Sequence, residues 1–172
     1  MGVSELEHIY NFQWISEKVA TSGQPKRSEL DTIAQAGFKV VINLGLHNGD
    51  YAISDEKEFV ESLGMDYVHI PVIWEQPTTE DLDRFLNLMN AYSGQRCFVH
   101  CAANKRVSVF MALHRIINLG WPRSEAELAI QEIWTPNETW LQFYTCELDK
   151  KSKIKKQISA PKYRSSINRT YL

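Results

Sequence analysis

Residues 98–110 read FVHCAANKRVSVF, and this stretch decides how the rest of the chain is interpreted. An apolar run ends in His100 and Cys101, small or polar residues follow, and an apolar helix-like pattern resumes at Val107. Successive backbone N–H groups in a strand-to-helix turn converge on one point, and with the helix N-terminus they attract an anion. The same field lowers the pKa of a thiol. The stretch therefore predicts a loop that cradles an anion against the thiolate of Cys101.

The side chains of this loop suit an anion of the phosphate type. Ala102 and Ala103 are small, so an anion can approach the backbone, and Arg106 offers a planar fork for two phosphate oxygens. Ser108 can place a hydroxyl near the sulfur and help it leave, while His100 can orient the loop through hydrogen bonds. The chemistry implied is attack of a thiolate on phosphorus, followed by hydrolysis of the phosphocysteine.

Apolar runs of strand length alternate with helix-like segments along the chain. Gly37, Gly64 and Gly120 each follow a helix-like segment, where a left-handed residue commonly ends the helix. This alternation predicts an α/β fold with a mainly parallel central sheet of about four to five strands, flanked by helices. Ligands of such sheets bind at the carboxyl ends of the strands, which is where Cys101 falls. The expected strands are 38–44, 67–72 and 96–100, and the expected helices are 26–36, 55–63, 78–92, 124–134, 137–148 and one that ends at 119.

The composition is that of an ordinary globular protein. The 172 residues suffice for one domain with a sizeable core, and 44% of them are hydrophobic and 23% charged. No run approaches the roughly 18 apolar residues of a membrane span. The opening residues MGVSELEHIY contain no apolar signal segment. We therefore expect a cytoplasmic protein without a membrane span.

Three cysteines, Cys97, Cys101 and Cys146, are too few for a disulfide framework, which favours a reducing compartment and a reactive thiol. Cys97 is either a redox partner of Cys101 or a small buried apolar residue. The five histidines form no metal-ligand spacing with each other or with the cysteines. We expect no metal and no cofactor.

Charge is divided unevenly along the chain, whose formal net charge is −2. Residues 150–172 hold eight Lys/Arg and no Asp/Glu, which leaves 11 basic and 21 acidic side chains in residues 1–149. An acidic body argues against binding to nucleic acid. Since no linker or repeat precedes residue 150, we predict one catalytic domain, 1–149, followed by a basic C-terminal tail, 150–172.

Five sequence pieces, in order, carry a resemblance that covers most of residues 12–148. They are VATSGQP (19–25), AGFKVVINL (36–44), GMDYVHIPV (64–72), HCAANKRVSVF (100–110) and IWTPNETW (133–140). The chain resembles the cysteine-dependent protein tyrosine/dual-specificity phosphatase superfamily, and is more similar still to bacterial phosphatase-like proteins with SGQP near the N-terminus. The resemblance implies a tyrosine-phosphatase-like fold and a metal-free phosphatase. It also implies that phosphate is bound along the loop, at Ala102, Ala103, Asn104, Lys105, Arg106 and Val107.

The arginine of the loop departs from the pattern of the family, which usually has Arg at the position of Val107, one residue after Arg106. One interpretation is a lost phosphate ligand. The other is a loop that is one residue shorter before the arginine, with Val107 packed inward as the helix begins. We favour the second, because a guanidinium beside an anion site has an evident use and no acidic neighbour in the loop explains it otherwise.

The general acid also departs from the pattern of the family. The family usually places an Asp on the loop after the strand 67–72, a few residues before a proline. Here that loop reads IPVIWEQPT, and Trp74 occupies the corresponding position. Glu75 is the nearest carboxylate, so we predict that Glu75 protonates the leaving oxygen; the alternative is a solvated loop carboxylate. A further departure is Gly45, where relatives often carry Arg after INL.

The sequence thus predicts a phosphatase that hydrolyses phosphate monoesters through a phosphocysteine on Cys101. The expected substrate is a phosphorylated protein or a small phosphate ester, and the oligomeric state is left open. One alternative is a pseudo-phosphatase that binds phosphate without turnover. Another is a rhodanese-like sulfurtransferase, which also uses a loop cysteine with a basic residue about five positions later. Such loops usually carry glycine near Asn104, and those enzymes lack the SGQP, IPV and IWTP pieces.

Overall fold

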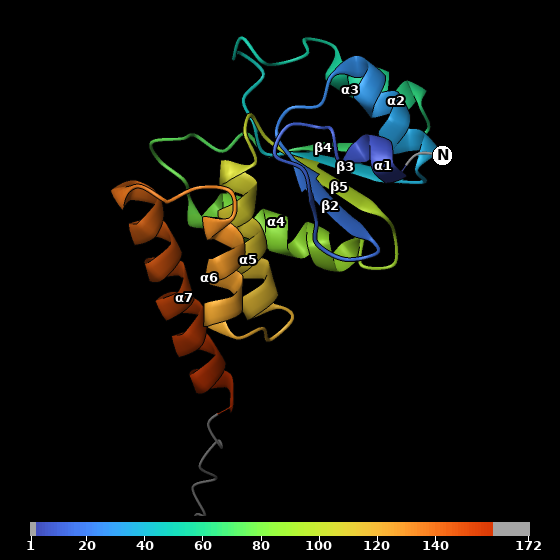
Figure 1. The fold of residues 1–172 in the computed structure, drawn as a ribbon. Coiled ribbons are helices and arrows are strands. Elements are labelled where there is room, and N and C mark those ends of the chain that lie inside the picture. The colour runs from blue at the N-terminus through green and yellow to red at the C-terminus, as the bar shows by residue number, and fades with distance from the viewer. Residues whose placement is uncertain (1–2, 160–172) are drawn as a thin grey trace, which may run out of the picture.

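The structure is a computed structural model that describes residues 3–159, and it has an α/β fold with one five-stranded sheet (Figure 1). Helices and strands alternate along most of this part of the chain, as expected. The elements are α1 (Val3–Leu6), β1 (Gln13–Trp14), β2 (Val19–Ser22), α2 (Arg27–Gln35), β3 (Val40–Asn43), α3 (Glu56–Ser62), β4 (Asp66–His69), α4 (Thr79–Ala91), β5 (Cys97–His100), α5 (Lys105–Ile117), α6 (Arg123–Gln131) and α7 (Glu138–Ser159).

The strand order in the sheet is β1-β2-β5-β3-β4. Strands β2, β5, β3 and β4 pair in parallel, and β1 adds an antiparallel edge beside β2. Strand β5 is central, because its residues pair with Val19–Ser22 on one edge and with Val40–Asn43 on the other. The predicted mainly parallel sheet flanked by helices is confirmed, and the β1–β2 hairpin is an addition to it.

The two faces of the sheet pack against different sets of helices (Figure 1). Cys97 and Val99 of β5 face a core shared with α4, α5, α6 and α7. Phe98 faces a second core shared with α1, α2 and α3. Alternation along the strand carries His100 to the face of Phe98, whereas Cys101 belongs to the core on the α5 side. Residues 3–159 contain no helix with the length and apolar character needed to cross a membrane.

The helix ends match the sequence signals. Gly37, Gly64 and Gly120 adopt left-handed φ angles of 86°, 78° and 72° after α2, α3 and α5. At the start of α7 the Asn137 side chain accepts the N–H of Trp140 at 3.1 Å. Helix α7 then runs through the predicted domain boundary at residues 149 and 150 and ends at Ser159. The rest of the predicted basic tail, 160–172, lies outside the described residues.

The turn after β2, which carries the SGQP motif, packs directly against the loop that follows β5. The N–H of Gln24 donates to the carbonyl of Ala102 at 3.1 Å, and the N–H of Gly23 donates to the carbonyl of Tyr10 at 2.7 Å. A Cβ at Gly23 would lie 2.6 Å from Cδ1 of Tyr10 and 2.9 Å from the Ala102 oxygen. Because that oxygen belongs to the backbone, a larger residue at position 23 has to displace the Cys101 loop.

Gly23→Ala is expected to lower the free energy of unfolding by about 1–3 kcal/mol, the usual effect of an extra methyl in a tightly packed site. Gly94→Ala is the matched control, because a Cβ at Gly94 meets no atom within 4 Å, and this variant is expected to be neutral or slightly stabilised. Urea unfolding followed by circular dichroism measures both. Equal stability of the two variants would contradict the packing described for the SGQP turn.

Candidate active site

Cys101 directly follows β5, at the carboxyl end of the central strand, in the short connection to α5. Its side chain is 1% exposed and its thiol is free. Three residues, Ala102 to Asn104, separate Cys101 from the first residue of α5. Asn104 takes a left-handed φ of 62° and occupies the N-cap position, so the chain turns sharply into the helix. The strand–turn–helix expected around Cys101 is therefore present.

The carbonyl side of this loop is held by the segment before β1 and by β2. Asn11 Nδ2 donates to the Ala103 carbonyl at 3.0 Å, and Asn104 Nδ2 donates to the Asn11 carbonyl at 2.7 Å and to Thr21 Oγ1 at 3.1 Å. The N–H side differs: within residues 3–159 no acceptor pairs with the backbone N–H groups of Ala102, Ala103, Lys105, Arg106 and Val107. Fixed carbonyls and free amides at a helix N-terminus are the arrangement that binds an anion.

Arg106 and Val107 lie in different surroundings. The Arg106 side chain is 7% exposed, its Nε donates to the Val72 carbonyl at 2.9 Å, and its guanidinium lies 5.3 Å from the Trp74 ring. The two terminal nitrogens of Arg106 have no hydrogen-bond partner in the described part of the chain. Val107, in contrast, is fully buried in the core that contains Cys101. Of these two consecutive residues, Arg106 thus presents N–H donors that are unpaired within residues 3–159, whereas Val107 packs in the interior.

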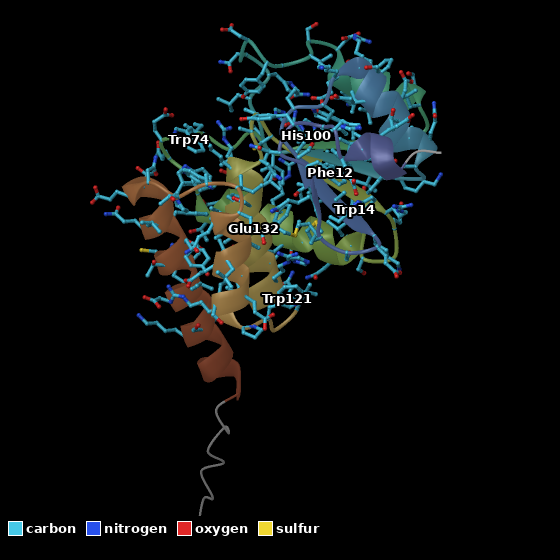
Figure 2. All side chains as sticks on the ribbon, viewed as in Figure 1. Phe12, Trp14, Trp74, His100, Trp121 and Glu132 are labelled. Atoms are coloured by element: carbon cyan, nitrogen blue, oxygen red, sulfur yellow. The ribbon has the colours of Figure 1, made fainter. Side chains whose placement is uncertain are left out.

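Ser108 and Lys105 both contact the indole of Trp134, a residue that no sequence pattern linked to the loop. Ser108 Oγ donates to the Lys105 carbonyl at 2.8 Å and accepts Nε1–H of Trp134 at 3.1 Å. The Lys105 ammonium lies 5.4 Å from the centre of the Trp134 ring. Trp134 also contacts Trp74 with 5.2 Å between ring centres, so the two indoles form a wall beside Arg106. Figure 2 shows Trp74 near the start of α7, where Nε1 of Trp140 donates to the Trp74 carbonyl at 3.1 Å.

Glu75 lies apart from the loop. It is exposed and lines an open cavity of about 290 Å³ beside α7, together with Cys146 and Glu147. Within residues 3–159 no hydrogen bond or ion pair joins Glu75 to the Cys101 loop. Its neighbour Trp74 is the residue of this segment that contacts Arg106. The general-acid role of Glu75 therefore stays a prediction.

His100 has a buried acidic partner, Glu56, that the sequence analysis missed. His100 Nε2 lies 2.9 Å from Glu56 Oε1, and the two side chains are 0% and 1% exposed. Burial alone would raise the pKa of Glu56, but the charge of His100 and hydrogen bonds from His100, Gln24 and Tyr67 outweigh it and hold the pKa at about 2. No sequence signal marks Glu56, because acids are common in the first turn of any helix.

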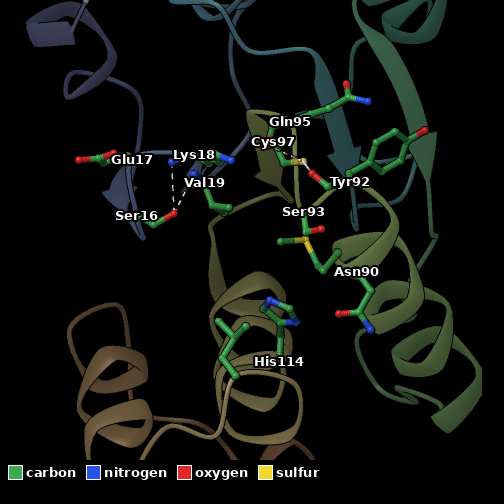
Figure 3. A pocket seen from close by; sticks show the side chains of 12 residues that line it. Ser16, Glu17, Lys18, Val19, Asn90, Tyr92, Ser93, Gln95, Cys97 and His114 are labelled. Carbon is green, nitrogen blue, oxygen red and sulfur yellow. Dashed lines mark hydrogen bonds between the residues drawn. The ribbon is translucent and has the colours of Figure 1, made fainter.

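Cys97 lies at the opposite end of β5, where it lines a cavity of about 390 Å³ with His114 and Tyr92 (Figure 3). Burial raises the pKa of its thiol to about 11, so Cys97 is protonated near neutral pH. Four residues of strand span about 13 Å, which exceeds the reach of a disulfide to Cys101. Cys97 therefore fits the buried apolar role rather than that of a redox partner. Within residues 3–159 no three His, Cys, Asp or Glu side chains group to hold a metal ion.

The Glu56 carboxyl makes stability depend on pH in the acid range. Its pKa is about 2 in the fold against an ordinary 4.5, so its contribution is fully present above pH 4.5 and is lost as the pH falls toward 2. We expect the melting temperature of the wild type to fall between about pH 5 and about pH 3, and that of Glu56→Gln to fall less. Glu58→Gln, on the same helix but exposed, is the control. The same pH slope in all three proteins would contradict the assignment.

Comparison with known proteins identifies the family. The family model described as DSP-PTPase phosphatase fused to NAD+ kinase matches residues 11–143. Beta-lactamase hydrolase-like proteins of Xylella fastidiosa and Agrobacterium fabrum are each 29% identical over 116 residues, which is 66% of this chain and 27% of each relative. The chain thus matches about a quarter of the length of these curated relatives.

Solved structures agree with the family model. A putative phosphatase from Shewanella putrefaciens is 31% identical, with a TM-score of 0.78 over 86% of this chain and 97% of its own. Tk-PTP in its active form, at 21% identity and a TM-score of 0.69 over 81% of this chain and 97% of its own, shares the fold. The family model spans every element from β1 into α7, and the chain therefore belongs to the DSP-PTPase phosphatase fused to NAD+ kinase family, within the cysteine-dependent tyrosine and dual-specificity phosphatase superfamily.

Proposed function

We propose that the chain hydrolyses phosphate monoesters through a phosphocysteine on Cys101. The observation that carries the proposal lies at one strand end, where a buried cysteine is followed by a row of amides and by an arginine whose terminal nitrogens, like those amides, have no partner within residues 3–159. Family membership supports a phosphatase of the tyrosine and dual-specificity type.

The reaction has two displacements at phosphorus. In the first, the Cys101 thiolate attacks, the bond from phosphorus to the ester oxygen breaks, and the leaving oxygen takes a proton. In the second, water attacks the phosphocysteine, the S–P bond breaks, and the thiolate returns while phosphate leaves. No electron transfer is needed, so the proposal requires no redox cofactor.

The neighbours of Cys101 supply the charge stabilisation for both steps. The terminal nitrogens of Arg106 and the loop amides hold the phosphoryl oxygens, whose charge is largest in the transition state. The Trp74 ring and the Val72 carbonyl fix the guanidinium plane, which is the requirement for a bidentate contact. Ser108 assists departure of the thiolate in the second step, for which its hydroxyl has to turn away from the Lys105 carbonyl. Glu75 donates the proton in the first step.

A second candidate is a protein that binds phosphate without hydrolysing it. Two observations favour it: Glu75 lines the cavity beside α7, and Trp74 stands where the family usually has its acid. Without a positioned acid, an alkoxide leaving group departs about 10²–10⁴-fold more slowly. Phosphate binding would survive, because the amides and Arg106 do not depend on that acid.

The first test replaces the nucleophile and its cation. Cys101→Ser is expected to lower kcat toward p-nitrophenyl phosphate by at least about 10³-fold, and Arg106→Ala by about 10²–10³-fold. Arg106→Lys keeps the positive charge but lacks the planar guanidinium that binds two oxygens at once, so it recovers only part of the kcat lost in Arg106→Ala. Cys146→Ser, at an exposed thiol of α7, is the control and keeps wild-type activity.

Three outcomes of this assay separate the candidates. Turnover retained in Arg106→Ala would remove the role given to the arginine. No turnover by the wild type, with vanadate still bound, would identify the phosphate-binding protein. Thiosulfate–cyanide transfer without phosphatase activity would identify a sulfurtransferase.

Glu75 is tested by leaving groups of different basicity. If it is the general acid, Glu75→Gln loses the basic limb of the pH–rate profile and slows an alkyl phosphate far more than an aryl phosphate, because only the alkoxide needs a proton to leave. Glu80→Gln, an exposed acid in the first turn of α4, is the control. An unchanged profile and equal effects on both substrates would assign the proton to another group.

A further inference from the structure

Glu56, the first residue of α3, is a carboxylate shut off from water on the face of the sheet opposite Cys101. Each of its oxygens has two polar contacts. Oε1 meets His100 Nε2 and Gln24 Nε2, both at 2.9 Å. Oε2 accepts from Asn43 Nδ2 at 2.9 Å and from the Tyr67 hydroxyl at 3.0 Å. The charge is therefore compensated from four directions, which explains why it is tolerated in the interior.

Two of these contacts belong to segments that touch the Cys101 loop. Gln24 binds Glu56 with its side chain and the Ala102 carbonyl with its backbone N–H. Asn43 binds Glu56 with Nδ2, while its Oδ1 accepts the N–H of Gly45 at 2.7 Å. A Cβ at Gly45 would lie 3.6 Å from the backbone nitrogen of Ala102, so this segment also borders the loop. The carboxylate is thus connected to the loop backbone by two routes.

The third route is His100, which directly precedes Cys101. The His100 carbonyl accepts the N–H of Leu44 at 2.8 Å, so its backbone is fixed by the sheet. Its ring is fully buried, and in residues 3–159 neither ring nitrogen makes a hydrogen bond of regular geometry, so the polar contact of the ring is the 2.9 Å approach of Nε2 to Glu56 Oε1. Glu56 is therefore the polar group that sets the orientation of this ring in the described part of the chain. Without Glu56, no polar group of the described residues holds the His100 imidazole in place next to Cys101.

We infer that Glu56 is a positioning residue for catalysis: through His100 and Gln24 it holds the loop amides and the Cys101 sulfur in the geometry that attack on phosphorus requires. The inference rests on the proposed phosphatase function. It adds to that function a residue, Glu56, on the face of the sheet opposite Cys101. Its effect comes from charge and placement, since Glu56 touches neither the sulfur nor the anion site. Misplacement of reacting groups by about 1 Å lowers rates by about 10²-fold.

Several titratable groups surround this carboxylate and enter any pH profile of its variants. Tyr67 stays protonated at neutral pH, because burial and the Glu56 charge raise its pKa. His47 Nε2 lies 3.0 Å from the Tyr67 hydroxyl. The His47 ring stacks on the His69 ring, with 3.7 Å between the ring centres. Burial lowers the pKa of His69. The groups to be considered are His100, Tyr67, His47, His69 and Glu58.

The test compares Glu56→Gln, Glu56→Asp and Glu61→Gln in the full chain, at a temperature where circular dichroism shows each to be folded; Glu61, an exposed acid of the same helix, is the control. Glu56→Gln removes the negative charge of the carboxylate and places a side-chain NH2 group, itself a donor, among the donors Gln24, Asn43 and Tyr67. We expect it to lower kcat toward p-nitrophenyl phosphate by about 10- to 100-fold with a smaller change in KM, to weaken vanadate binding, and to alter the pH profile of Cys101 alkylation by iodoacetamide. Glu56→Asp, which keeps the charge, recovers part of each effect.

A double-mutant cycle with His100→Ala tests the route. If Glu56 acts mainly through His100, adding Glu56→Gln to His100→Ala lowers kcat much less than Glu56→Gln does alone. A purely structural role predicts a lower melting temperature with wild-type kcat and alkylation profile in the folded variant, and that result would overturn the inference. Should the wild type show no turnover, the proposed function fails, while alkylation and vanadate binding still decide the role of Glu56.

Discussion

Strand β5 is enclosed on every side, and the site depends on this constraint. It is hydrogen-bonded to β2 and β3 along its two edges and covered by a helical core on each face. A strand so placed has to be apolar, and the chain leaving its carboxyl end has to turn at once into α5. Within residues 3–159 the turn leaves backbone N–H groups at the helix N-terminus without partners, directly after Cys101, the candidate nucleophile. The fold and the candidate anion site are therefore consequences of one topological position.

A second layer of interactions makes that turn rigid. Its carbonyls are bound by Asn11 and by the SGQP turn, while the buried carboxylate of Glu56 holds His100 from the opposite face of the sheet. A buried charge is costly unless it is surrounded by donors, and its donors here come from four separate segments. Loss of one donor or of the charge itself leaves the others unsatisfied. The network is thus suited to fix one geometry, which is the requirement of an electrostatic catalytic site.

Local signals in the sequence were sufficient for most of the fold. The apolar run at 96–100 and the glycines after helices located β5 and the helix ends within one or two residues, because strand and cap signals are short-range. The surroundings of Arg106 were not predictable in this way. Its guanidinium is oriented by the Val72 carbonyl and the Trp74 ring, which come from a loop more than thirty residues earlier. Glu56 was not predictable either, since an acid in a first helical turn has an ordinary explanation until its partners from β3, β4, β5 and the turn after β2 are known.

A crystal structure with vanadate would decide whether the loop amides and Arg106 hold a phosphoryl group over Cys101. We expect vanadium bonded to the Cys101 sulfur, equatorial oxygens on the loop amides and the terminal nitrogens of Arg106, and Val107 still buried. Vanadate bound away from Cys101, or held there with the guanidinium turned aside, would contradict this expectation.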